Sequence, residues 1–207
     1  MSDSTSNQPM PAIIHKPRLR SQGFSNLYRK TLFAMLALML VAYLVFAPDP
    51  WHLPRLAAIL FEVLGLAFLF AGIVGRVLAT MSIGGHKDRR IICTELYSVC
   101  RNPLYFASFL LAVGVGLMSS RVDFLLLVVG GFLGIFYPMM RNEACYLRER
   151  FADYGDYERG VPMFFPNFRL WKERASFEIN FRLVRRTLLD SLVVLLVVPL
   201  LIFLRWH

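Results

Sequence analysis

Five apolar runs constrain the fold of this chain more than any other feature. They are Thr31–Ala47, roughly Leu56–Ala79, Leu104–Met118, Phe124–Met140 and Leu188–Leu204. A helix needs about 20 apolar residues to cross a bilayer, with a range of roughly 17–25. The second run meets this length, the first, fourth and fifth are at its short end, and the third meets it only if Pro103 and the residues before it are counted. The runs predict an all-α integral membrane protein with about five transmembrane helices. An alternative is that one run is a re-entrant or buried helix.

The domain organisation follows from the position of these runs. Residues 1–30 form a polar tail without an early apolar region, so we expect no cleavable signal peptide. Residues 31–207 are predicted to form a single membrane domain, which ends in the helix at 188–204. That last helix has no function that the sequence predicts, and the oligomeric state stays open.

Composition favours a membrane partner over a nucleic acid. The chain is 57% hydrophobic and only 18% charged, whereas soluble domains carry about 25% charged residues. The net charge of +9 comes from residues that lie mostly between the apolar runs. Anionic headgroups and membrane topology explain this pattern better than nucleic acid does. The three cysteines are an odd number without a CxxC spacing, which argues against a disulfide framework or a zinc site.

The distribution of Lys and Arg predicts the orientation. Nineteen of the 23 basic residues lie before the first run, between the second and third, or between the fourth and fifth. The positive-inside rule therefore places the N-terminus, residues 80–103 and residues 141–187 in the cytoplasm of an inner or plasma membrane. The C-terminus would face out, with Trp206 as an interfacial anchor. Arg76, near the inner end of the second run, could snorkel to the inner surface. Glu62 and Asp190 lie close to the ends of their runs, so placement at the interface stays open beside a functional role within the membrane.

Two polar segments flank a predicted helical hairpin. The first, Leu96–Tyr105, has Pro103 where a helix would begin, and Pro suits a first helical position. The second, Arg141–Tyr157, is expected to continue the fourth run as an amphipathic helix that ends at Val161–Pro166. Five residues, 119–123, join the two helices, so the polar segments should meet. Glycines that would permit close approach of the helices are Gly114, Gly116, Gly130, Gly131 and Gly134.

The segments contain none of the common nucleotide, metalloprotease or hydrolase motifs. His86 stands beside two glycines without a second ligand at metal-binding spacing, so we predict a loop histidine and no metal site.

The order of residues in the two segments resembles a known family of membrane enzymes. Tyr97, Arg101, Pro103 and Tyr105 form Tyr-x-x-x-Arg-x-Pro-x-Tyr, and the segment from Arg141 to Phe151 reads Arg-x-Glu-x-x-x-Leu-x-x-x-Phe. This resembles the isoprenylcysteine carboxyl methyltransferases and their phospholipid methyltransferase relatives, which are multi-helix enzymes that use S-adenosylmethionine. The resemblance covers residues 80–166, less than half of the chain.

The resemblance implies a set of residues around S-adenosylmethionine. The implied cofactor-binding residues are Arg89, Arg90, Ile91, Ile92, Tyr97, Asn102, Pro103, Leu104, Tyr105 and Glu143. The family arginine implicated with substrate corresponds to Arg141. From the chemistry of the side chains, Arg101 and Arg141 could hold an anionic acceptor through paired N–H groups, and the tyrosine faces could favour a sulfonium.

The chain departs from the family pattern at three positions. Asn102 stands where the family has His, and Asn cannot transfer a proton. Glu95 stands where Gly is common, and the usual Glu-Glu pair is Glu143-Ala144.

The predicted function is methyl transfer from S-adenosylmethionine to a lipophilic acceptor with a carboxylate, phosphate or headgroup, at the boundary of membrane and cytosol. The expected partners are that lipid-like substrate and membrane lipids. Two alternatives stay open, a phospholipid amine N-methyltransferase and a non-catalytic small membrane protein such as a transport subunit or scaffold. Each residue alone also has a structural interpretation: Arg101 as a topology charge, Pro103 as a helix start, the tyrosines as interfacial aromatics.

Overall fold

The computed structural model describes residues 31, 35, 38–44, 46–47, 53–83, 92–173 and 180–206. These residues form helices and turns, with no strand among them. The helices are α2 (Arg55–Ile83), α3 (Leu96–Val99), α4 (Pro103–Met118), α5 (Val122–Arg150), α6 (Tyr154–Gly160), the short 3-10 helix η1 (Phe168–Leu170) and α7 (Phe181–Trp206). The all-α prediction is confirmed.

Two helices are long and apolar enough to cross a membrane within the described residues. They are α2 and α5, with 29 residues each, which corresponds to roughly 43 Å of helix. Of the 18 most apolar consecutive residues, only 22% are buried in α2 and 17% in α5. Both helices therefore present wide apolar faces that neighbouring helices do not cover. Such faces are consistent with association with a membrane. The apolar helix α4 is shorter, and most of the first predicted run lies outside the described residues.

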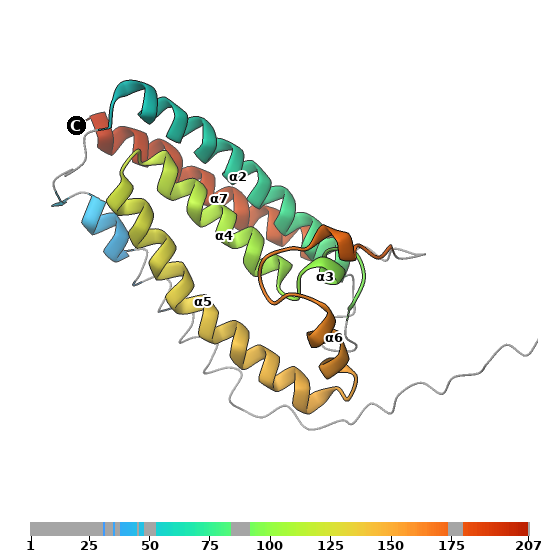
Figure 1. Ribbon diagram of the computed structural model, residues 1–207. Helices are drawn as coiled ribbons and strands as arrows, with labels where there is room; N and C mark the ends of the chain where they lie inside the picture. The colour runs from blue at the N-terminus through green and yellow to red at the C-terminus, as the bar shows by residue number, and fades with distance from the viewer. Residues whose placement is uncertain are drawn as a thin grey trace, which may run out of the picture. The chain divides into compact units, whose positions relative to one another are not determined.

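The helices α2, α4 and α7 pack side by side (Figure 1). Glycines bring the backbones of α2 and α4 together: a Cβ on Gly72 would lie 2.9 Å from the Ala107 carbonyl oxygen, and one on Gly114 would lie 2.9 Å from the Gly65 carbonyl oxygen. Real Cβ atoms are not found that close to backbone. The expected close approach of α4 to α5 is found at Gly116, where a Cβ would lie 3.1 Å from the Leu125 Cα atom, whereas Gly114 approaches α2 instead. The expectation is wrong at Gly130 and Gly134, where a Cβ would meet nothing within 4 Å.

The helices α4 and α5 form the predicted hairpin. Pro103 occupies the first turn of α4, as expected, and Gly116 packs against Leu125 beyond the turn. Aromatic side chains then line the contact between the two helices, where the Phe109 and Phe132 rings lie 5.5 Å apart.

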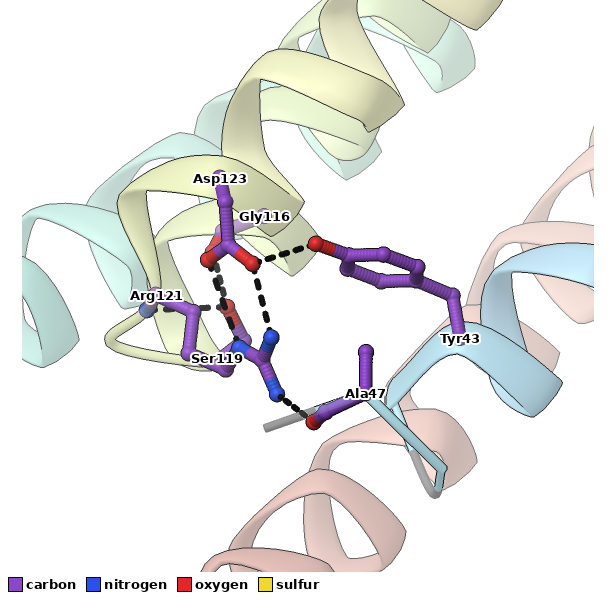
Figure 2. Close-up of polar contacts among 6 residues, drawn as sticks. All are labelled: Tyr43, Ala47, Gly116, Ser119, Arg121 and Asp123. Carbon is purple, nitrogen blue, oxygen red and sulfur yellow. Dashed lines mark hydrogen bonds and ion pairs between the residues drawn. The ribbon is translucent and has the colours of Figure 1, made fainter. Parts of the chain in front are cut away.

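A closed polar network holds the turn of this hairpin (Figure 2). The Arg121 guanidinium is paired with Asp123 at 2.7 Å and donates to the Ala47 carbonyl oxygen at 2.9 Å. The Tyr43 hydroxyl donates to the same Asp123 carboxylate at 2.6 Å. Because Tyr43 and Ala47 come from the segment before α2, the network ties that segment to the α4–α5 turn.

The helix α5 continues past its apolar part into the second polar segment, as predicted, and contains Pro138 in its interior. The expected end of the helix at 161–166 is wrong. Extended backbone at Phe151 ends α5, and after residues 151–153 the chain re-enters a helix as α6. Tyr154, the first residue of α6, is 3% exposed, so the break places this side chain in the protein interior.

We expect Gly72→Val to destabilise the bundle, because the added side chain would meet the backbone of α4. Overpacking of this kind costs about 1–3 kcal/mol of unfolding free energy. The measurement is equilibrium unfolding of the purified protein in detergent micelles. Gly130→Val is the matched control, since it introduces the same side chain in α5 where the space is open. Equal losses in the two variants would contradict the packing described.

Candidate functional site

The polar end of the bundle is built on one irregular segment, residues 161–173, which packs against α3 and the start of α4. The Arg101 amide donates to the Pro162 carbonyl oxygen at 2.9 Å, and the Asn167 amide donates to that of Val99 at 2.9 Å. The Lys172 amide donates to the Ser98 hydroxyl at 3.0 Å. These bonds fasten the first polar segment, Leu96–Tyr105, to residues 161–173.

Arg101 lies in an ion-pair network that the sequence did not predict. Its guanidinium is paired with Glu158 of α6, and Glu158 is also paired with Arg148 of α5. The two guanidinium groups, first that of Arg148 and then that of Arg101, lower the pKa of Glu158 to about 2. The positive charge predicted to hold an anionic acceptor is therefore already balanced by a carboxylate. The Nε atom of Arg101 is buried and has no partner.

The structure brings together two other predicted site residues, Tyr105 and Glu143. The Tyr105 hydroxyl donates to the Glu143 carboxylate at 3.1 Å, which links α4 to the polar half of α5. The pKa of Tyr97 is raised by burial and, to a lesser extent, by the Glu143 charge, so Tyr97 stays neutral. Arg141 is exposed on α5. The first polar segment is thus joined to the second by the hydrogen bond of Glu143 and by the Tyr157 hydroxyl, which donates to the Tyr97 carbonyl oxygen at 2.7 Å.

Asn102 and Cys100 have structural partners. The Asn102 side-chain amide donates to the Met163 carbonyl oxygen at 2.9 Å, and the Cys100 thiol donates to that of Phe164 at 3.0 Å. Burial raises the pKa of the Cys100 thiol to about 11, so it remains protonated at neutral pH. All three cysteines are free. Both side chains thus fasten the 161–166 segment.

The other residues predicted to bind the cofactor are three apolar side chains and a basic stretch before them. Pro103 is buried, and Ile92 and Leu104 are half-buried. Arg89, Arg90 and Ile91 lie outside the described residues.

Glu95 is the most strained residue of this region. Its φ is 56° and its ψ is −130°, a backbone conformation that suits glycine. The side chain is 6% exposed, and neither carboxylate oxygen has a hydrogen-bond partner. The position is the one where the sequence has Glu in place of a common Gly, and the backbone conformation gives the physical reason why Gly would suit it.

A second polar cluster lies inside the bundle and corrects the prediction for Arg76. This side chain does not simply snorkel: its Nε donates to the Ser191 hydroxyl of α7 at 2.9 Å, and its Nη1 donates to the Ser108 hydroxyl of α4. One turn further along α2, the Thr80 hydroxyl bonds that of Thr187 at 3.1 Å. The guanidinium therefore connects three helices. A sequence signal for this cluster exists, because Ser108 and Ser191 are polar residues within or beside the apolar runs of the two facing helices.

Within the described residues, no group of three or more His, Cys, Asp or Glu side chains is arranged to hold a metal ion.

Comparison with known proteins gives two relatives that align over most of the chain. The nickel-cobalt-cadmium resistance protein NccN of Alcaligenes xylosoxydans xylosoxydans is 27% identical over 181 residues, which is 87% of this chain and 84% of the relative. The cobalt-zinc-cadmium resistance protein CzcN of Cupriavidus metallidurans is 24% identical over 191 residues, 92% of this chain and 87% of the relative. No protein-family profile matches the chain, and no solved structure matches it.

These relatives correct the functional prediction. Both are named for resistance to metals, which contradicts methyl transfer as the main interpretation. They agree better with the alternative of a small non-catalytic membrane protein. No finding tests the resemblance itself or binding of S-adenosylmethionine, and both stay predictions.

The Glu158 network predicts a dependence of stability on acid pH. A glutamate has a pKa of about 4.3 in the unfolded chain, whereas the pKa of Glu158 in the fold is about 2. The unfolded state therefore binds more protons between these values, so the stabilising contribution is complete above about pH 4.3 and is lost as the pH falls toward 2. Thermal unfolding measured between pH 7 and pH 2 should show this loss. Glu158→Gln should flatten that part of the profile, and an unchanged profile in the variant would contradict the network.

The Arg76 cluster predicts energetic coupling across the bundle. Ser191→Ala should lower the unfolding free energy by about 1 kcal/mol, because interhelical hydrogen bonds in membrane proteins are worth about 0.6–2 kcal/mol. The same change in an Arg76→Met background should cost close to nothing, since the bond is then already gone. A double-mutant cycle in detergent measures the difference, and additive losses would show that the two side chains do not interact.

Proposed function

We propose that this chain is a helical membrane protein that contributes to resistance against divalent transition-metal cations of the nickel, cobalt, zinc and cadmium class. The observation that carries the proposal is the pair of relatives, which align over more than four fifths of both chains and are both named for cobalt and cadmium resistance. The apolar, weakly buried faces of α2 and α5 support a place in a membrane.

The role that we propose is that of a non-catalytic membrane component. The bundle is suited to this role because close glycine contacts join α2 to α4, and the Arg76 hydrogen bonds join α2 to both α4 and α7. Such a rigid module could support a transport assembly or stabilise a partner in the membrane.

The proposed topology has five spans. The segment at 31–47 and the helices α4 and α7 would cross together with α2 and α5. The distribution of Lys and Arg supports an inner-membrane location with the N-terminus, the polar end of α5 and residues 151–173 in the cytoplasm. The Arg101–Glu158–Arg148 network would then lie at the cytoplasmic surface.

Deletion of the gene from its own host tests the proposed function. We expect growth of the deletion strain to be inhibited at a two-fold or more lower concentration of Co²⁺ or Cd²⁺, with sensitivity to Mg²⁺ unchanged. The full-length gene on a plasmid should restore resistance, and the Gly72→Val gene should restore less because that variant folds poorly. The host's other membrane components are retained in this design.

Two measurements make the result decisive. The membrane fraction is probed for the protein, so that lack of restoration is not confused with lack of expression. The metal content of the cells is measured by mass spectrometry at a concentration that does not inhibit growth. Equal sensitivity of the deletion and parent strains to Co²⁺, Ni²⁺, Zn²⁺ and Cd²⁺ would overturn the proposal.

A further inference from the structure

Three large aromatic side chains project outward from the 161–173 segment. Phe165 is 70% exposed, Phe168 is 67% exposed and Trp171 is 47% exposed. In water, this much apolar surface within seven residues is unfavourable, so such patches mark contact with another apolar phase.

The aromatic side chains are held in this position by the backbone beneath them. The segment bonds to α3 at both ends of η1, through the Asn167 amide on the Val99 carbonyl and the Lys172 amide on the Ser98 hydroxyl. Phe164, the neighbour of Phe165, is 9% exposed and packs in the aromatic core against Phe109. Phe164 of this segment therefore lies in the core, whereas the side chain of its neighbour Phe165 is exposed.

The aromatic residues are interleaved with basic ones. Arg169 and Lys172 are exposed on the same short segment, and α7 begins with exposed Phe181 and Arg182, followed by exposed Arg185 and Arg186. Between residues 165 and 186 the sequence has six Lys or Arg and two Asp or Glu. The excess of positive charge is complementary to an anionic surface.

The position of the segment in the bundle is the boundary of the apolar helices. It packs on α3, which lies beside the last turns of α2 and directly before the start of α4 (Figure 1). Aromatic residues with basic neighbours at the ends of apolar helices are typical of the headgroup layer of a membrane.

We propose that Phe165, Phe168, Trp171, Arg169 and Lys172 form a surface that inserts into the headgroup layer and binds anionic phospholipids. The aromatic rings would enter the layer, and the two cations would pair with lipid phosphates. This inference does not depend on a role in metal resistance, since it rests on exposure, charge and position alone.

The fluorescence of Trp171 tests the proposal in the full-length chain. The chain has three tryptophans, so Trp51→Phe and Trp206→Phe leave Trp171 as the only one. The protein is reconstituted in vesicles of phosphatidylcholine with 30% phosphatidylglycerol, with one of the two lipids brominated near the headgroup end of its acyl chains. We expect bromine to reduce Trp171 emission at least two-fold, and brominated phosphatidylglycerol to quench more than the same fraction of brominated phosphatidylcholine.

Charge variants separate the lipid preference from the insertion. Arg169→Gln with Lys172→Gln should abolish the preference for phosphatidylglycerol and retain quenching by phosphatidylcholine. Arg159→Gln is the matched control, since this exposed cation lies on α6, outside the 161–173 segment, and is paired with Asp156. It should change neither quantity.

Two outcomes would overturn the proposal. Emission that neither brominated lipid quenches would place Trp171 in water, where a protein partner would be the better occupant of the surface. Equal quenching by the two lipids in the parent chain would show that the basic residues do not select anionic headgroups.

Discussion

The contact between α2 and α4 is the interaction on which the other features depend. Gly65, Gly72 and Gly114 let two backbones approach until carbonyl oxygens lie where a side chain would begin. Without side chains between them, the helices are close enough for Arg76 to reach Ser108 on α4, and it also reaches Ser191 on α7. In a membrane the hydrophobic effect does not drive helices together, so close packing and interhelical hydrogen bonds hold them. The polar end of the bundle depends on this contact, because α3 packs against α2 and directly precedes α4.

Parts of the fold followed directly from local sequence. Pro103 predicted the start of α4 because its missing amide hydrogen is needed only beyond the first turn, and the five residues at 119–123 predicted the hairpin. The environment of each glycine could not be predicted, since Gly114 and Gly130 look alike until the neighbours of each helix face are known. The break at Phe151 was also missed, because no Pro or Gly marks it and the burial of Tyr154 depends on tertiary contacts.

The candidate site shows the same division. The hairpin predicted that the two polar segments would meet, and the hydrogen bond between Tyr105 and Glu143 is one of the contacts that join them. Sequence reasoning did not find Glu158, because α6 folds back only after the break in α5, and so Arg101 and Arg148 looked unpaired. The functional prediction relied on a resemblance over residues 80–166, whereas the two relatives align over most of the chain and are named for another process. A short motif was therefore a weaker guide than similarity along the whole length.

Pro138 interrupts the backbone hydrogen bonding of α5, although the helix is continuous from Val122 to Arg150. A proline in a helix interior has no amide hydrogen for the carbonyl four residues earlier, which here belongs to Gly134. The helix therefore lacks one backbone hydrogen bond close to the point where its apolar part gives way to the charged part. The half of α5 beyond this position is therefore held in place by contacts outside the helix as well, namely the Tyr105 hydrogen bond to Glu143 and the ion pair of Arg148 with Glu158.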